Sequence, residues 1–199
     1  MNYKKQLEEA ISKLQTKGAK FGGNRIEINS PISEDDIAVI NMLTENSPIL
    51  SGVLFDFYKQ MNGTSFHWSL PDEEAEGGVI ISTAMVAALR SGANEDSEPL
   101  EGVLYSDEQD ESDLKLLKEM YILDSVPGRS DFITFIPNGN DLKLYLIEGL
   151  DITELKTNLI ETLNIITKYV GCWGTRQHLT HSDWEQRIAN DKLIQKLFL

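Results

Sequence analysis

The chain has 199 residues, 41% of them hydrophobic and 25% charged, and its 18 Lys and Arg against 32 Asp and Glu leave a net charge of −14. This length suits one domain with a proper core, and the composition is that of an ordinary globular protein, so wholesale disorder is excluded. A surface of this sign is repelled by nucleic-acid phosphates and by anionic membranes. We therefore expect neither nucleic acid nor membrane among its partners.

The sequence also bears on location. No apolar run approaches the roughly 18 residues that span a bilayer. The first twenty residues are charged and amphipathic, without the apolar core of a signal peptide. The one cysteine, Cys172, cannot form an intramolecular disulfide. These features predict a cytoplasmic protein.

Negative charge is concentrated in the middle of the chain. Residues 72–113 contain thirteen acidic residues and one basic residue, Arg90, a net of −12 that leaves −2 for the other 157 residues. This stretch can be no more than a solvated surface, as charge runs usually are. It can also be a surface for a basic partner, because concentrated charge steers association with the opposite sign. The candidate partner-binding residues are Asp72, Glu73, Glu74, Glu76, Asp107, Glu108, Asp110 and Glu111.

The N-terminal third predicts three helices and a strand. Apolar residues recur at helical spacing over 3–17, 34–43 and 51–61. Ser33 is a candidate N-cap for the second helix, and Asn62-Gly63 is expected to end the third, because both residues tolerate the left-handed conformation. Aromatic and polar side chains then alternate over 65–70, as in a half-buried strand. The apolar face of the third helix comprises Leu54, Phe55, Tyr58 and Met61.

Strand signals follow, and helices close the chain. Short strands are predicted at 79–81 and 103–105, and short helices at 83–89 and 114–120. Two strands, 132–136 and 142–147, flank Asn138-Gly139-Asn140 and predict an antiparallel hairpin. A helix over 155–170 is expected to end at Gly171, and a last helix to begin with a capping box of Ser182 and Glu185. Its apolar face comprises Trp184, Ile188 and Ile194. Helices at both ends with strands between them predict an α+β fold with a central, mostly antiparallel sheet.

Two histidines raise the question of a metal. His178 and His181 form an H-x-x-H pair whose rings would point the same way on a helix. A zinc site needs a third ligand and usually a carboxylate behind the imidazoles. Ser182, as a candidate helix cap, places the pair in a loop, so we expect solvent-exposed polar residues and no metal. A metal-dependent hydrolase built on this pair and nearby carboxylates stays open as an alternative.

Other patterns do not indicate catalysis or a cofactor. The Gly22-Gly23 and Gly77-Gly78 pairs lack a following G-K-[ST], and no G-x-S-x-G, H-E-x-x-H or EF-hand loop is present. No sequence signal pairs Cys172 with a base, so a buried, inert thiol is expected. His67 is expected to face the surface beside buried aromatics. We expect a protein that is not an enzyme and has no cofactor.

One stretch resembles a known family. An aromatic-rich helix end, Leu54-Phe-Asp-Phe-Tyr58, runs into Asn62-Gly63 and then into a strand with Phe66-His-Trp68. With the acidic helix start before it and the hairpin over 132–147 after it, this order resembles the SUKH superfamily, also called the Smi/Knr cell-wall-regulator family. The resemblance implies that residues 1–199 form one SUKH-like α+β domain, in which 72–113 is an acidic middle region. It gives mainly structural roles to the motif residues Tyr58, Asn62, Gly63 and Trp68.

The resemblance also implies a function. Many bacterial SUKH proteins look like immunity proteins, which bind a cognate toxin domain and block its active site. A nuclease toxin has a basic substrate groove, which an acidic surface can occupy electrostatically. A regulatory or scaffold role of the Smi/Knr type is a further alternative. The aromatic residues Tyr58, Phe66, Trp68 and Trp173 are expected in the core, although an exposed Trp would instead be an interface anchor.

Overall fold

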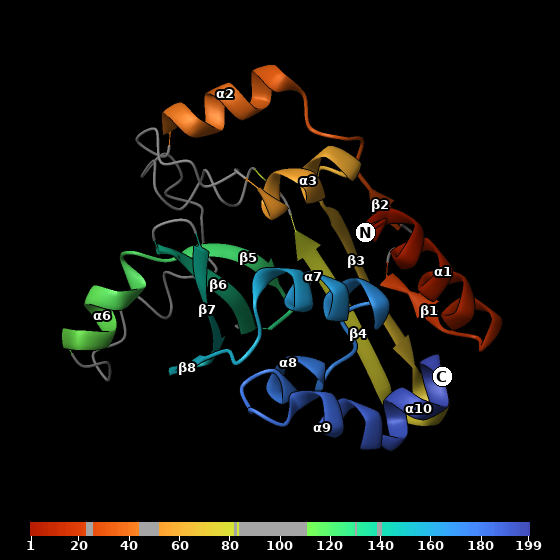
Figure 1. Cartoon of the computed structure of the whole chain (residues 1–199). Coiled ribbons are helices and arrows are strands. Elements are labelled where there is room, and N and C mark those ends of the chain that lie inside the picture. Colours follow the sequence, from red (N-terminus) through yellow and green to blue (C-terminus); the bar gives the residue numbers. More distant parts are fainter. Residues whose placement is uncertain (23–25, 44–51, 82, 84–110, 130, 139–140) are drawn as a thin grey trace.

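An antiparallel sheet, covered on one face by helices from both ends of the chain, makes up the protein (Figure 1). The structure, a computed structural model, describes residues 1–22, 26–43, 52–81, 83, 111–129, 131–138 and 141–199. The strands are β1 (Lys20–Phe21), β2 (Glu27–Ile28), β3 (Thr64–Leu70), β4 (Ala75–Ile81), β5 (Tyr121–Ser125), β6 (Asp131–Asn138), β7 (Asp141–Glu148) and β8 (Asp151–Glu154). The helices are α1 (Tyr3–Thr16), α2 (Glu34–Leu43), α3 (Val53–Gln60), α6 (Glu111–Leu117), α7 (Leu159–Lys168), α8 (Thr175–His178), α9 (Trp184–Asn190) and α10 (Lys192–Phe198), with a 3₁₀ turn, η2 (Pro71–Glu73). The fold is α+β, as the sequence predicts.

The strand order is β1-β3-β4-β5-β6-β7-β8, and β2 also pairs with β3. Two short strands therefore share the β3 edge that lies opposite β4. Along β3 every second side chain is buried, which confirms the predicted half-buried strand. The hairpin of β6 and β7 is confirmed as well, with Asn138 paired to Asp141 at its end. The buried β3 side chains are Thr64, Phe66, Trp68 and Leu70.

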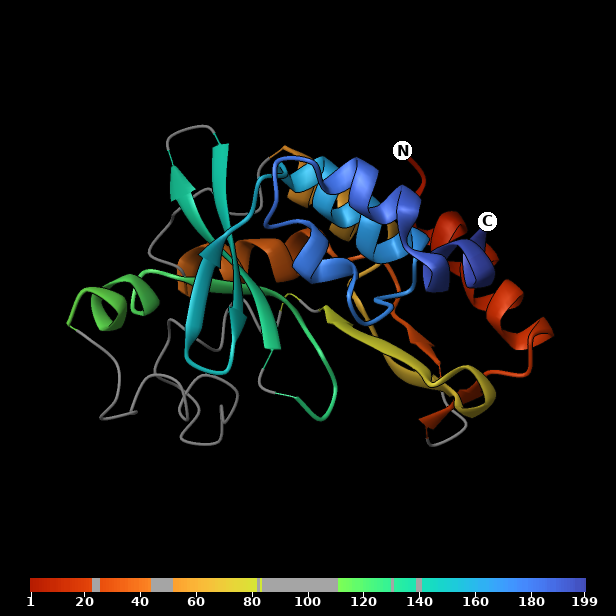
Figure 2. The same cartoon turned by 90° about the horizontal axis from the view of Figure 1, so that it is seen from below.

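The helical layer over the sheet comprises α1, α3, α7 and α10 (Figure 2). The N-terminal helix is as predicted, with the Asn2 side chain accepting the Lys5 amide at 3.0 Å as an N-cap. The Ser33 hydroxyl caps α2 in the same way, through the Asp36 amide at 3.1 Å. A second, smaller core lies under α6, formed by Leu117, Met120, Ile122, Phe132, Tyr145 and Ile147.

The buried face of α3 corrects the sequence prediction. Phe57 is fully buried, whereas Phe55 is partly exposed with the Lys59 ammonium 4.3 Å from its ring centroid. The reason is that i, i+3, i+4 and i+7 from Leu54 lead to Phe57, Tyr58 and Met61, and Phe55 lies off that stripe. The helix ends at Gln60, and only Gly63 of the Asn-Gly pair adopts the left-handed conformation, with φ of 85°.

Asn62 and Gly63 connect three separate segments. The Asn62 amide donates to the Ser30 carbonyl at 2.8 Å, and its side-chain oxygen accepts the Thr83 hydroxyl at 2.6 Å. The Gly63 carbonyl accepts the Asn29 amide at 3.0 Å. These contacts join the approach to α2, the start of β3 and the end of β4.

Several predicted boundaries are wrong. The helix predicted from 155 begins at Leu159, where Asn158 and Glu161 form a capping box, and the helix predicted over 114–120 begins three residues earlier. The predicted capping box at Ser182 is also wrong, because α9 begins at Trp184 with Asp183 at its N-cap position. The predicted last helix is two helices, since Asp191 ends α9 and caps α10. The segments predicted at 83–89 and 103–105 lie outside the described residues, apart from Thr83.

The sheet opens between β4 and β5, and a buried arginine fills the opening. These strands pair at one position, Ile80 with Ser125. Arg176 of α8, 2% exposed, donates from Nε to Asp124 Oδ2 at 2.7 Å, from Nη2 to the Gly78 carbonyl at 2.9 Å, and from Nη1 to the Gly171 carbonyl at 3.1 Å. One guanidinium thus joins β5, β4 and the segment that follows α7.

Removal of this guanidinium should destabilise the fold strongly. We expect Arg176→Met to lower the free energy of unfolding by about 3–5 kcal/mol, because the Asp124 carboxylate would stay buried without its cation. Chemical denaturation followed by circular dichroism measures the change. As a control, Arg187→Met breaks the exposed pair with Asp183 and should shift the midpoint little. If the two substitutions lowered the free energy of unfolding equally, the stabilising role of the buried Arg176 guanidinium would be contradicted.

Candidate functional site

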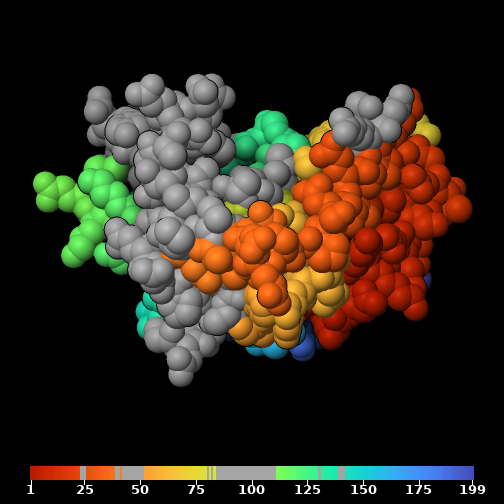
Figure 3. All heavy atoms as spheres, turned by 90° about the horizontal axis from the view of Figure 1, so that it is seen from above, coloured from red at the N-terminus to blue at the C-terminus, as the bar shows by residue number. Residues whose placement is uncertain are grey.

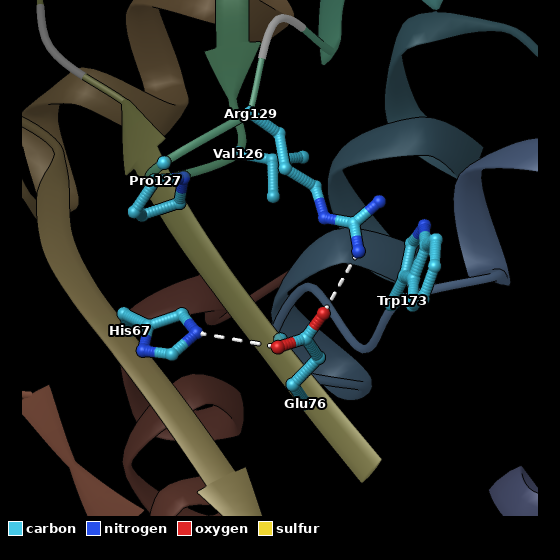
Figure 4. Close-up of a pocket in the computed structure, with 8 residues that line it drawn as sticks. His67, Glu76, Val126, Pro127, Arg129 and Trp173 are labelled. Carbon is cyan, nitrogen blue, oxygen red and sulfur yellow. Dashed lines mark hydrogen bonds and ion pairs between the residues drawn. The ribbon is translucent and has the colours of Figure 1, made fainter. Parts of the chain in front are cut away.

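A pocket of about 520 Å³ opens to solvent where β4 and β5 diverge (Figure 4). Its side chains come from the β3–β4 hairpin, with His67 on β3 and Glu76 on β4, and from two distant segments, the β5–β6 turn at 126–129 and Trp173 after α7. Convergence of charged and aromatic side chains in a preformed hollow is typical of binding sites. We take this pocket as the candidate functional site.

The residues after α7 run along β4 like a short extra strand. The Trp173 amide donates to the Glu76 carbonyl at 2.9 Å, and the Gly78 amide donates to the Gly171 carbonyl at 3.2 Å. Gly77 and Cys172 form an antiparallel bridge. Side chains alternate across such a strand, so the burial of Cys172 in the core directs Trp173 outward, where it is 44% exposed. The expectation of a core position for Trp173 is therefore wrong, whereas Tyr58, Phe66 and Trp68 are buried as predicted.

Glycines allow this close approach. A Cβ on Gly77 would lie 2.7 Å from the Trp68 indole, whose Nε1 donates to the Val170 carbonyl at 2.9 Å. A Cβ on Gly171 would lie 2.3 Å from the Gly78 carbonyl oxygen, and Gly171 has φ of 57°, in the left-handed region. The Gly77-Gly78 pair, which fits no phosphate-binding motif in the sequence, thus has a structural explanation.

Arg129 is the centre of the site's charged contacts. Its Cζ lies 3.5 Å from the centroid of the Trp173 ring, and its Nη2 donates to Glu76 Oε1 at 2.9 Å. Its Nη1 lies 3.9 Å from Asp131 Oδ2. On the other side of the pocket, His67 Nε2 lies 3.9 Å from Glu76 Oε2, with the ring at the surface as the sequence predicts (Figure 4). These contacts hold the Arg129 guanidinium in place.

The predicted acidic residues are not gathered into one described surface. Asp72 and Glu74 are exposed in the β3–β4 turn, whereas Glu73 bonds to Lys196 of α10 and Glu76 to Arg129. Glu111 lies on α6, at the opposite end of the molecule from that turn (Figures 1 and 2). The space-filling view also places α6 at one end, away from α1 (Figure 3). Asp107, Glu108 and Asp110 lie outside the described residues.

The two histidines of the predicted metal alternative have different surroundings. His178 Nε2 lies 2.8 Å from Asp191 Oδ2, and this pair joins α8 to the junction of α9 and α10, whereas His181 is exposed. Burial acts to raise the pKa of Asp191, but hydrogen bonds from His178 and the Ile194 amide bring it below its ordinary value. Within the described ranges, no three His, Cys, Asp or Glu side chains are grouped as metal ligands.

The sequence does not predict a site formed by Arg129 and Glu76. Glu76 is an acidic candidate only through its charge, and Arg129 belongs to no motif. The local signals are limited to a Pro127-Gly128 turn before a strand and a Trp after Gly-Cys. Neither places Arg129 on Trp173, because that contact depends on the opening in the sheet.

Comparison with known proteins adds no relative. The chain matches no protein-family model, no curated protein and no solved structure. The resemblance to the SUKH superfamily therefore stays a prediction from the residues quoted above. A membrane-spanning helix, sufficiently long and apolar, is not found in the part of the chain that the structure describes.

Substitution of Gly171 should disrupt the strand-like segment. We expect Gly171→Ala to lower the free energy of unfolding by at least about 3 kcal/mol, since it adds a steric clash to the cost of a left-handed residue. Gly128→Ala is the matched control, because Gly128 also has positive φ but has open space around its Cβ position. The control should cost about 1–2 kcal/mol. Chemical denaturation measures both free energies of unfolding. If Gly171→Ala and Gly128→Ala did not differ beyond experimental error, the close packing of Gly171 on β4 would be contradicted.

The thiol of Cys172 should be inert in the folded protein. Burial, assisted by the Asp191 carboxylate, raises the pKa of Cys172 to about 12, although Arg176 acts to lower it. At pH 8 about one thiol in ten thousand would be ionised, so alkylation by iodoacetamide should be at least about 100-fold slower than in the unfolded chain. Because folding raises this pKa, the contribution of the thiol to stability is lost as pH rises from the unfolded pKa towards 12. Rapid alkylation of the native protein would show that the thiol is accessible.

Proposed function

We propose that this chain is a non-enzymatic protein-binding module that acts as an immunity protein, neutralising a cognate toxin by binding to it. The observation that carries the proposal is the exposed Trp173, fixed by backbone hydrogen bonds to β4 and covered on one face by Arg129. Tryptophan and arginine dominate the energetic centres of protein interfaces. The resemblance of residues 32–147 to SUKH proteins supports the same class of function.

The rigidity of this surface supports binding to a preformed partner surface. Trp173 is held by the β4 edge, and Arg129 by the Trp173 ring and the Glu76 carboxylate. Side chains that are already ordered lose little conformational freedom on association, so more of the contact energy appears as affinity.

The exposed acidic residues of the β3–β4 turn would attract a basic partner to one end of the molecule. Asp72 and Glu74 are exposed in the turn that leads into β4, and Glu74 is two residues before Glu76 of the pocket. A basic partner would approach this end of the molecule first, and its association would slow with added salt. A nuclease toxin, whose substrate groove is basic, is the partner class that we propose.

The immunity role can be tested by capture and by rescue. The chain, used as bait in an extract of its source cells, should retain one protein in one-to-one amounts at low salt and lose it at moderate salt. Expression of the captured protein alone should stop growth of a heterologous host, and co-expression of this chain should restore growth. A captured protein that does not affect growth would contradict the immunity role.

Reversal of charge at the turn should slow association. For Asp72→Lys with Glu74→Lys, we expect the association rate with the captured protein to fall several-fold at low salt, on the order of 3–10-fold, with a flatter salt dependence. The dissociation rate should change little. The matched control, Glu8→Lys with Asp151→Lys, has the same net charge change at exposed sites outside 72–113. A further variant reverses Asp107, Glu108 and Asp110. Unchanged association of both variants, measured by stopped flow, would exclude an acidic contact surface.

A further inference from the structure

The pocket has two unlike walls. The imidazole of His67 and the ring of Pro127 stand on one side, and the Arg129 guanidinium, backed by Trp173, stands on the other (Figure 4). The backbone of β4 at Gly77 lies between the walls. A flat group therefore fits between them better than a tetrahedral or branched one.

The charges around Arg129 disfavour an anionic ligand. Nη2 of Arg129 already donates to Glu76, and Nη1 faces the Asp131 carboxylate. An incoming carboxylate or phosphate that approached these nitrogens would lie near both carboxylates, and like charges repel. Two of the guanidinium nitrogens thus already face the protein's own acids, and a neutral group against the planar face avoids this repulsion.

A cationic ligand is disfavoured for a related reason. Glu76, the carboxylate of the pocket, already faces Arg129 and His67. A lysine or arginine from a partner would have to lie beside Arg129 to reach it. A neutral aromatic ring meets no such repulsion, because the negative face of a ring attracts a guanidinium.

The polar atoms of the pocket suit an aromatic side chain with a polar end. The Glu76 carboxylate and the His67 imidazole can accept a phenol O–H or an indole N–H, while the ring lies against Pro127 and Arg129. Phenylalanine would leave these groups without a new partner. The volume of about 520 Å³ also leaves space for the loop that carries the ring.

We propose that this pocket is the anchor site of the binding surface, and that it takes one tyrosine or tryptophan side chain from a loop of the partner protein. The proposal rests on the protein-binding function proposed above and names the residue chemistry that this function uses. Basic residues of the partner near the aromatic one would be attracted by the exposed Asp72 and Glu74 of the turn before β4. Arg129 contacts the incoming ring, and Trp173, which lies against the guanidinium, is a positioning residue for Arg129.

Short peptides test the site without knowledge of the partner. The probe is the capped tripeptide Ac-Lys-Tyr-Lys-NH2, and the control probe is Ac-Lys-Ala-Lys-NH2, which has the same charge and no ring. In a two-dimensional ¹H–¹⁵N NMR titration, the tyrosine peptide should shift the Trp173 indole and the Gly77 amide saturably, with Kd on the order of millimolar. The alanine peptide should shift neither signal to saturation. Equal responses to the two peptides would overturn the proposal.

Two variants distinguish the contribution of the planar Arg129 guanidinium from that of its positive charge. Arg129→Lys keeps the charge and removes the planar guanidinium, and Trp173→Ala removes the ring behind it. Each substitution should raise the Kd of the tyrosine peptide at least about 3-fold. Arg187→Lys, an exposed arginine on α9, should leave the peptide affinity unchanged. Both pocket residues are partly exposed, and the folded state of each variant is checked by its amide spectrum. Undiminished binding in both pocket variants would overturn the proposal.

The captured partner distinguishes failure of the site from failure of the function. Trp173→Ala should lower the affinity for the captured protein at least about ten-fold, mainly through faster dissociation of the complex. If Trp173→Ala binds the captured protein with unchanged affinity, and the tyrosine peptide causes no saturable shifts, the anchor site is overturned. The proposed immunity function is not contradicted by that result. A tyrosine peptide that binds as expected, with no protein captured from the extract, would support the site and contradict the immunity function.

Discussion

The buried guanidinium of Arg176 is the constraint on which the rest of this structure depends. Where β4 and β5 diverge, the carbonyls of Gly78 and Gly171 point to the buried Arg176, and the Gly171 carbonyl also accepts the Gly78 amide. Buried carbonyls without a hydrogen bond are costly. Arg176 donates to both, and the Asp124 carboxylate balances its charge. The arginine therefore supports an opening in the sheet that would otherwise be unfavourable, and the candidate site lies over that opening.

The opening between β4 and β5 also determines how the side chains of the pocket are arranged, because it admits the backbone of residues 171–173 beside β4. The segment at 171–173 occupies the free edge of β4, and strand alternation directs Cys172 inward and Trp173 outward. Arg129 then lies on Trp173, and Glu76 binds Arg129. A pocket assembled in this order is rigid because each side chain is held by an element that the fold needs. The same order explains why Gly77 and Gly171 cannot be replaced by larger residues without a clash.

Several residues that suggest chemistry in the sequence stabilise the fold. His178 pairs with Asp191, which also caps α10 through the Leu193 and Ile194 amides and so divides the predicted last helix in two. Glu73 binds Lys196 and joins the β3–β4 turn to the C-terminal helix. In the β3–β4 turn, Glu73 is thus engaged by the protein itself, while Asp72 and Glu74 are exposed to solvent.

Local patterns were sufficient to predict α1, β3, the β6–β7 hairpin and the α+β class, because helix caps, alternation and turn residues act between near neighbours in the chain. They failed at β5, a short strand buried on both faces that has no alternation. At Phe57 the prediction was wrong although the helical spacing from Leu54 leads to that residue. Charge alone determined that one region is strongly acidic. Which acids stay exposed, that Trp173 faces solvent, and that Arg129 meets it were decided by the tertiary structure, because these contacts join segments that only the divergence of β4 from β5 brings together.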